Sequence, residues 1–168
     1  GENVLAETNN FEMLITDEND LSGLPEGTIE AAKQLAESKE QDGWLFTLDH
    51  PIYIPFVTYA DNRELRKKLY IAAGKKAFKS DALDNQQNVL TITKLRFERA
   101  QLLGYKTHAH FVLEERMAKT PEKVEAFLQD LSTKAKPAAL REIFELKEFA
   151  KQLDGIEQLE KWDSAYYS

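Results

Sequence analysis

The stretch GWLFTLDHPIYIPFVTYADNRELRKKLY, residues 43–70, contains the signals on which the fold prediction depends most. Strand-forming residues follow one another in WLFTL at 44–48, directly after an Asp-Gly turn, which predicts a short strand. Residues 49–62 are ambiguous, because their β-branched and aromatic side chains favour a strand while their apolar residues also recur at helical spacing. Pro55 argues against a central strand, because it lacks the N–H that a strand ladder requires. The stretch therefore predicts one strand or hairpin and leaves its second half open.

Helical patterns precede this stretch and continue from its end. Apolar periodicity predicts a helix over 3–15 and a second helix over 26–39, the latter rich in Ala, Glu, Lys and Gln. Asp61 with Glu64 resembles a capping box, which predicts a further helix over 63–78. The inward residues of that helix are expected to be Leu65, Leu69, Ala72 and Ala73.

Cap and stop residues predict two helices farther along the chain. Asp84 is the expected cap of a helix over 85–103, and Gly104 is expected to close it, because glycine suits a left-handed helix terminus. Thr107 is expected to cap a short helix that runs through Met117.

The last long helix is predicted to start at Thr120-Pro121, because the first helical position does not need the N–H that proline lacks. Pro137 should kink this helix or divide it, and Gly155 should end it. IEQLEKW at 156–162 is expected to form a short final turn. The predicted fold class is all-α and multihelical, with one short β-strand or hairpin near residues 43–49.

Composition supports a globular, helix-rich protein and excludes several functions. Of the 168 residues, 30% are charged and 42% are hydrophobic, a balance that allows a core without disulfides. The net charge of -7, from 29 acidic and 22 basic residues, disfavours a nucleic-acid partner. The chain has no cysteine, which excludes disulfides, thiolate catalysis and cysteine-based metal sites.

The sequence also lacks membrane and secretion signals. No apolar run reaches the length of a membrane span, and the start lacks the basic-then-apolar pattern of a signal peptide. We therefore expect no membrane partner and favour the cytoplasm, with the periplasm as an alternative. The chain starts on a helical pattern without methionine and stops on WDSAYYS, so we expect an internal piece of a longer protein.

The stretch THAHFVLEE, residues 107–115, is the candidate metal site. His110 and Glu114 share a helix face, whereas His108 and His110 lie about 200° apart and cannot ligate one ion from a regular helix. A zinc site of the HExxH type needs two histidines four residues apart with a glutamate between them. Because the stretch lacks that spacing, a polar or aromatic-like role for its histidines is favoured over metal binding. His50, next to a proline, is expected in a turn.

Other charged groups are weaker candidates. The adjacent acids Glu114-Glu115 and Asp17-Glu18 point apart on a helix, so a solvated face is favoured over paired acid–base chemistry. A basic helix could meet an acidic ligand, although solvent exposure is the simpler interpretation of its lysines, which are Lys67, Lys68, Lys75, Lys76 and Lys79. The residues alone identify no catalytic residue and no metal ligand, and they leave the substrate-binding residues unassigned.

Three stretches of the chain together resemble one known family. They are residues 43–70, LLGYKTHAHFVLEERMAKTPEKVEAFL at 102–128 and the closing WDSAYYS at 162–168. Their W-x-x-T-L-D, Y-x-P-x-x-T-Y-x-D-N and W-D-x-x-Y-Y elements are similar, in order and spacing, to those of the thimet oligopeptidase and peptidyl-dipeptidase group of zinc metallopeptidases. Within this group the dipeptidyl carboxypeptidase branch is expected to be nearest, with oligopeptidase A close to it.

The resemblance implies a parent enzyme in which two mostly helical lobes wall a channel that admits short peptides. Zinc would be held by an HExxH helix and a later glutamate that follow the W-D-x-x-Y-Y element, and HExxH does not occur in this chain. We therefore expect residues 1–168 to form a single non-catalytic part of the channel wall, to bind no zinc and to pack against the missing catalytic lobe. The same resemblance implies that PIYIPFVTYA is helical and that His108 replaces an aromatic residue.

The leading hypothesis is a helical portion, inactive alone, of a zinc-dependent peptidyl-dipeptidase or oligopeptidase that releases C-terminal dipeptides from short peptides. The alternative is a free-standing helical module that binds or scaffolds other proteins. In either case we expect exposed apolar surface near the two ends to promote association, because four aromatic residues lie there: Phe11, Trp162, Tyr166 and Tyr167.

Overall fold

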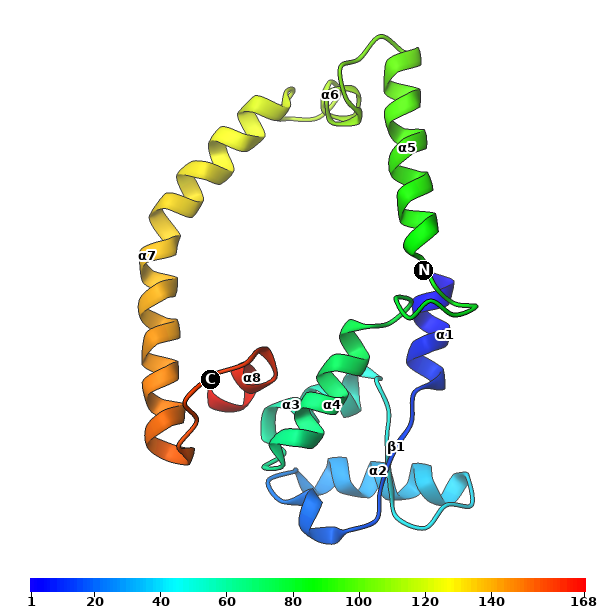
Figure 1. The fold of residues 1–168 in the computed structure, drawn as a ribbon, viewed down its shortest axis with the longest axis vertical. Coiled ribbons are helices and arrows are strands. Elements are labelled where there is room, and N and C mark those ends of the chain that lie inside the picture. Colours follow the sequence, from blue (N-terminus) through cyan, green and yellow to red (C-terminus); the bar gives the residue numbers. More distant parts are fainter. The chain divides into compact units, whose positions relative to one another are not determined.

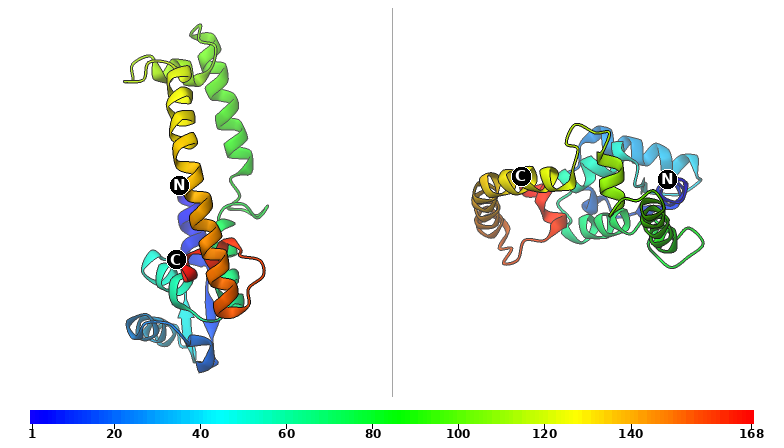
Figure 2. Two further views of the ribbon diagram at one scale, coloured as in Figure 1. Left: turned by 90° about the vertical axis from the view of Figure 1, so that its left-hand side faces the viewer. Right: turned by 90° about the horizontal axis from the view of Figure 1, so that it is seen from above.

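The computed structural model describes all of residues 1–168, and the chain divides into two compact units. The first unit combines residues 1–84 with 146–168, and the second unit is residues 85–145. Helices dominate both units, as the three ribbon views show (Figures 1 and 2). The predicted mostly helical fold class is confirmed.

The first unit contains the two strands and most of the short elements. In chain order these are α1 (Glu2–Asn10), β1 (Met13–Ile15), the 3-10 helix η1 (Glu18–Leu21), α2 (Glu26–Ser38), β2 (Trp44–Phe46), α3 (His50–Tyr59), α4 (Arg63–Gly74), the end of α7 (Pro121–Asp154), the 3-10 helix η2 (Lys161–Asp163) and α8 (Ser164–Tyr167). The predicted strand at 44–48 and helix at 26–39 are confirmed.

The two strands pair antiparallel, with Met13 opposite Phe46 and Ile15 opposite Trp44. The prediction of a helix over 3–15 is wrong in its second half, because α1 ends at Asn10 and a strand follows. The strand β2 therefore pairs with a distant segment rather than with a local hairpin partner. Gly43 permits this close approach: its φ is +130°, and a Cβ there would lie 2.4 Å from the Ile15 carbonyl oxygen.

The core lies where the strands pack against α2, α3 and α4. Phe46 and Phe56 are fully buried, and their rings meet edge to face with centroids 4.8 Å apart. The other fully or nearly fully buried residues of this core include Met13, Ala32, Leu48, Ala60 and Leu69.

Residues 50–59 form the helix α3, which confirms the interpretation drawn from the family resemblance. Pro55 lies inside this helix and removes only one backbone hydrogen bond, to the carbonyl of Pro51. Burial of Phe56 and Val57 on one side outweighs that loss. His50 is the first residue of the helix, so its predicted place in a turn is wrong.

The cap of α4 is Asn62 rather than Asp61. The Asn62 side chain accepts hydrogen bonds from the backbone N–H groups of Glu64 and Leu65, at 3.1 and 3.2 Å. The helix ends at Gly74 instead of continuing to residue 78. Of its predicted inward residues Leu69 is fully buried, and the others are half-buried against the core.

The second unit consists of α5 (Gln86–Leu102), α6 (His108–Leu113) and the first part of α7 (Pro121–Asp154). Three predicted signals are confirmed: Gly104 has a φ of +82°, Thr107 accepts from the His110 N–H, and α7 begins at Pro121. Gly155 follows the last residue of α7 with a φ of +68°, also as predicted.

Two boundary predictions in this part of the chain are wrong. Asn85 rather than Asp84 is the N-cap of α5, and Asp84 instead accepts a hydrogen bond from the Ser80 N–H. The short helix α6 ends at Leu113 and does not reach Met117. Of the two outcomes predicted for Pro137, division of the helix does not occur, because α7 is continuous through this residue.

Large apolar side chains are exposed along the second unit and also toward the chain ends, where Leu5 is 62% and Leu153 is 59% exposed. Ala100 is the one buried hydrophobic residue of residues 85–145. Tyr167 is buried, and Phe11, Trp162 and Tyr166 are half-buried, so the predicted exposure of these aromatic residues is wrong. No helix of the structure has the length and apolar character needed to cross a membrane.

Candidate functional site

A group of polar residues around the buried Arg66 and Asp163 joins α4 to the C-terminal residues of the first unit. We call it the arginine–aspartate cluster and define it as Asp61, Arg63, Arg66, Asp163 and Tyr166. Asp163 and Tyr166 belong to the W-D-x-x-Y-Y element, whereas the other three residues lie about 100 positions earlier.

Asp163 is fully buried at the centre of the cluster. Arg63 donates to both of its carboxylate oxygens, from Nε at 2.9 Å and from Nη2 at 2.7 Å, and Arg66 Nη2 adds a contact at 3.4 Å. The backbone N–H of Glu160 also donates to Oδ2, at 2.9 Å. Burial alone would raise the pKa of Asp163, but the hydrogen bonds from Arg63 and Glu160 hold that pKa below its ordinary value. Asp163 is therefore a charged acceptor at neutral pH.

Arg66 is the buried cation of the cluster, with 1% of its surface exposed. Its Nη1 donates to the carbonyl oxygens of Ala60 at 2.6 Å and Asp61 at 3.2 Å. The guanidinium carbon lies 3.8 Å from the centroid of the Tyr166 ring. Of the three guanidinium nitrogens of Arg66, only the buried Nε has no hydrogen-bond partner. Arg66 thus holds the end of α3 and the W-D-x-x-Y-Y element together.

Asp61 receives two hydroxyl donors instead of capping a helix. Ser22 Oγ donates to Oδ2 at 2.6 Å, and the Tyr166 hydroxyl donates to Oδ1 at 2.7 Å. The hydrogen bond from Ser22, followed by that from Tyr166, lowers the pKa of Asp61. The hydrogen bond to Asp61 in turn raises the pKa of Tyr166. Tyr166 is therefore a neutral hydrogen-bond donor to the Asp61 carboxylate, and the two residues do not form a pair of nucleophile and general base.

Tyr167 anchors the final helix to the end of α7. Its hydroxyl donates to Asp154 Oδ2 at 2.7 Å, and its ring centroid lies 6.3 Å from that of Phe149. Burial and the neighbouring Asp154 carboxylate raise the pKa of Tyr167 to about 12.

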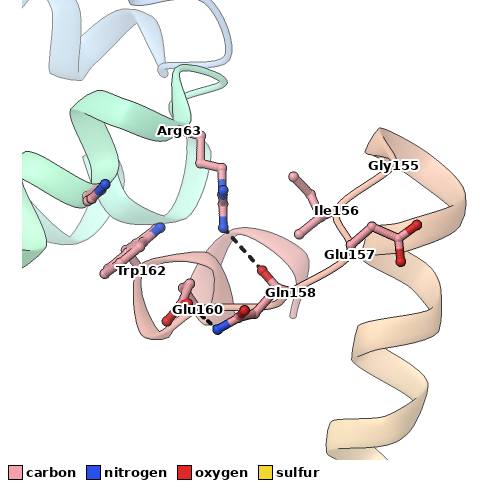
Figure 3. A pocket seen from close by; sticks show the side chains of 8 residues that line it. Arg63, Gly155, Ile156, Glu157, Gln158, Glu160 and Trp162 are labelled. Carbon is pink, nitrogen blue, oxygen red and sulfur yellow. Dashed lines mark hydrogen bonds between the residues drawn. The ribbon is translucent and has the colours of Figure 1, made fainter.

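A pocket of about 530 Å³ opens beside the cluster, between α4 and the loop that follows α7 (Figure 3). Arg63 Nη2 donates to the Gln158 carbonyl oxygen at 3.3 Å across it. The pocket is lined by Arg63, Lys67, Gly155, Ile156, Glu157, Gln158, Glu160 and Trp162.

The charged groups that line this pocket already have partners. Arg63 is paired with Asp163, Glu157 accepts from Lys151 at 2.9 Å, and Glu160 accepts from Gln158 at 2.7 Å. Lys67 lies 3.6 Å from Glu64 and 5.3 Å from the centroid of the Trp162 ring. The arrangement therefore braces the loop and provides no unpaired acid or base for proton transfer.

The candidate metal ligands are held by separate neighbours. His108 Nδ1 lies 3.5 Å from Arg99 Nη2, whereas His110 Nδ1 lies 2.7 Å from Thr107 Oγ1 and its Nε2 lies 3.4 Å from Glu122. Glu114 accepts instead from the Tyr105 hydroxyl. No three His, Asp or Glu side chains of the chain converge as metal ligands.

Two of the five predicted basic residues tie α1 to the chain after α4. Lys79 pairs with the buried carboxylate of Glu7, and Lys76 Nζ donates to Thr8 Oγ1 at 3.1 Å. The predicted solvent exposure holds for Lys68, Lys75 and Lys79, whereas Lys67 and Lys76 are half-buried. Asp17 accepts from the Asn19 N–H at the start of η1 and does not converge with Glu18.

The comparison with protein families gives the class of protein. The sequence profile of Peptidase family M3 matches residues 56–168, a range that contains the whole arginine–aspartate cluster. This range is more than half of the chain, so the chain belongs to peptidase family M3.

Individual relatives carry oligopeptidase names. Oligopeptidase A of Salmonella typhimurium is 45% identical over 170 residues, which cover 99% of this chain and 25% of the relative. Probable cytosolic oligopeptidase A of Arabidopsis thaliana is 39% identical over 176 residues, with the same coverage. Dipeptidyl carboxypeptidase of Escherichia coli is 28% identical over 166 residues, 24% of its length. The chain thus spans about a quarter of these relatives, and the expectation that the dipeptidyl carboxypeptidase branch is nearest is wrong.

The sequence motifs contain the cluster, but they predict only a helix-capping role for Asp61 and none for its other members. A signal for Arg66 was present, because it lies three positions before the core residue Leu69 and therefore on nearly the same helix face. A second signal was Asp163 between aromatic residues, where a carboxylate needs a buried partner. Neither signal identifies the partner, which lies about 100 residues away.

Proposed function

We propose that this chain is the non-catalytic helical portion of a larger zinc-dependent oligopeptidase that cleaves short peptides. The observation that carries the proposal is the match of nearly the whole chain to one quarter of oligopeptidase A, at 45% identity. Membership of peptidase family M3 supports the same conclusion. The identities favour the oligopeptidase A branch over a peptidyl-dipeptidase that releases C-terminal dipeptides.

The residues of this chain do not fit the zinc site that the family implies, because His108, His110 and Glu114 have different partners. In the parent enzyme, zinc bound elsewhere would polarise the scissile carbonyl and activate water. The role of this chain is positional: the arginine–aspartate cluster fixes the W-D-x-x-Y-Y element against α3 and α4. We place the chain in the wall of the peptide channel, packed against the catalytic lobe, in a cytoplasmic enzyme with the periplasm as the alternative.

The second candidate is a free-standing helical module that binds or scaffolds other proteins. It is favoured by the exposed apolar side chains of α5 and α7, such as Leu102 at 87% and Phe127 at 65% exposure. The two candidates differ in what the natural reading frame encodes after Ser168. An HExxH motif followed by a later glutamate is expected for the oligopeptidase and not for the module.

The experiment compares the isolated 168-residue chain with the protein from the complete reading frame. Both are tested on internally quenched peptides of about ten residues, with zinc content measured by mass spectrometry. The complete protein should cleave the peptides and lose activity with a chelator, and the isolated chain should do neither. Zinc-dependent cleavage by the isolated chain, or a complete protein without peptidase activity, would overturn the proposal.

A further inference from the structure

Helix α5 exposes large apolar side chains on two separate faces. At about 100° per residue, one face contains Val89, Leu90 and Phe97. The centre of the second face lies about 150° around the helix from the first. It contains Ile92, Leu95, Leu102 and Leu103, with Asn88 and Arg99 between them. All seven side chains are between 48% and 87% exposed.

A narrow polar stripe separates the two apolar faces on one side of α5. Its members are Gln87, Thr91, Lys94 and Glu98, at intervals of four, three and four residues. Gln87 Nε2 donates to Thr91 Oγ1 at 3.4 Å, and Lys94 Nζ lies 3.8 Å from Glu98 Oε1. The side chains of this stripe therefore already pair along the helix and do not need another partner.

Helix α5 has two apolar faces, whereas a surface helix of a globular protein typically has one apolar stripe, which faces the core. Monomeric proteins rarely leave large contiguous apolar patches in water. The single buried residue of α5, Ala100, shows that the elements in this structure leave most of both faces uncovered.

Helix α7 repeats the pattern within the second unit. Phe127, Leu128 and Leu131 share one face and are 51% to 65% exposed. Leu140, Ile143 and Phe144 share another face, about 160° around an ideal helix, and are 48% to 62% exposed. Both long helices of the unit thus need cover on two sides.

We propose that α5 is covered on both apolar faces by helices of the parent oligopeptidase that lie outside these 168 residues, and that its polar stripe stays in contact with water. The occupant is the remaining parent chain, because this chain spans a quarter of its relatives and the other three quarters supply the necessary surface. This inference rests on the proposed function, since it requires that the parent chain exists. A second copy of this chain is the competing occupant.

Single cysteines test the proposal, because the chain has none of its own. Val89→Cys and Leu95→Cys probe the two apolar faces, and Thr91→Cys on the polar stripe is the matched control. Maleimide labelling of the α5 peptide is followed by mass spectrometry, in the dilute isolated chain and in the complete protein. In the isolated chain, all three cysteines should react at similar rates.

In the complete protein, labelling at 89 and at 95 should slow by about 100-fold or more, since it requires local opening, while labelling at 91 stays within a few-fold. Labelling at 89 or 95 as fast as at 91 would overturn the proposal. Disulfide cross-linking between two copies of the complete protein that carry Val89→Cys or Leu95→Cys would overturn it in favour of a dimer.

Peptide hydrolysis by the same preparations separates this inference from the proposed function. Slow labelling at 89 and 95 in a complete protein without peptidase activity would support the enclosed helix and reject the oligopeptidase. A complete protein that is an active peptidase but whose α5 is labelled rapidly on either apolar face would support the oligopeptidase and reject the enclosed helix.

Discussion

The two units of the chain treat their apolar side chains in opposite ways. The first unit buries Met13, Phe46, Phe56 and Leu69 to 1% exposure or less. The second unit, of 61 residues, buries one hydrophobic residue, Ala100, and leaves the large side chains of α5 and α7 in water. Burial of apolar area is the main favourable term in folding, so the first unit contains its own source of stability and the second does not.

The contrast between the units predicts that an Asp→Ala substitution lowers the free energy of unfolding more in a buried ion pair than in an exposed one. Asp163→Ala leaves Arg66 buried without its carboxylate, which should cost about 3 to 5 kcal/mol of unfolding free energy. Asp130→Ala is the control in the second unit, because Asp130 pairs with Lys134 at 2.7 Å with both side chains more than 60% exposed. It should cost less than about 1 kcal/mol. Urea unfolding followed by circular dichroism measures both, and equal losses would contradict the contrast.

Truncation of one leucine in each unit should sharpen the contrast in apolar packing. Leu69→Ala removes a fully buried side chain and should cost about 2 to 5 kcal/mol. Leu131→Ala removes a side chain that is 51% exposed and should change stability by less than about 0.5 kcal/mol. The same urea titration compares the two, and a loss at Leu131 that matched the loss at Leu69 would show that the second unit has a core.

Alkaline pH should weaken the first unit through Tyr167. Its pKa is raised from 10.0 to about 12 in the folded chain, so its stabilisation is complete below pH 10 and is lost as pH rises toward 12. The loss should be about 3 kcal/mol, because the shift is about two pKa units and each corresponds to about 1.4 kcal/mol. Tyr167→Phe should remove this part of the alkaline decline in unfolding free energy. Tyr59→Phe, at a half-exposed tyrosine of α3, should leave the decline in place.

The exposed apolar side chains of the second unit should cause the isolated chain to self-associate. Single substitutions there should have the smallest effects of those predicted. Phe127→Asp and Leu95→Asp each place a charge on an exposed apolar face and should weaken association by about tenfold. Lys134→Asp on an exposed polar position of α7 is the control and should have little effect. Multi-angle light scattering over a concentration series measures the change. A chain that stays monomeric at high concentration would contradict the prediction.

Local signals predicted much of the fold. Thr107, Pro121 and Gly155 mark helix ends by their own chemistry, which depends on neighbouring backbone groups alone. β1 was missed because a three-residue strand needs a partner, and that partner is about 30 residues away. For α3, the residues alone could not decide between strand and helix, and the family resemblance did.

The candidate site was less predictable, for a related physical reason. Asp61 followed by Glu64 looked like a cap, but its carboxylate accepts from Ser22 and Tyr166, 39 and 105 positions away. The position of Arg66 near Leu69 on α4 indicates a buried face, but it does not identify the partner, which is Asp163. Pairings at this separation depend on the finished tertiary structure, which local periodicity does not contain.

The separation of Arg63 from Asp163, 100 positions along the chain, also has a consequence during translation. A ribosome that adds about 5 to 20 residues per second needs about 5 to 20 s to synthesise the intervening segment. For that time the nascent α4 exposes two arginines whose carboxylate does not yet exist, so the first unit cannot close while it is being made. Its completion waits for the synthesis of residues 161–167, after the whole of the second unit has been made.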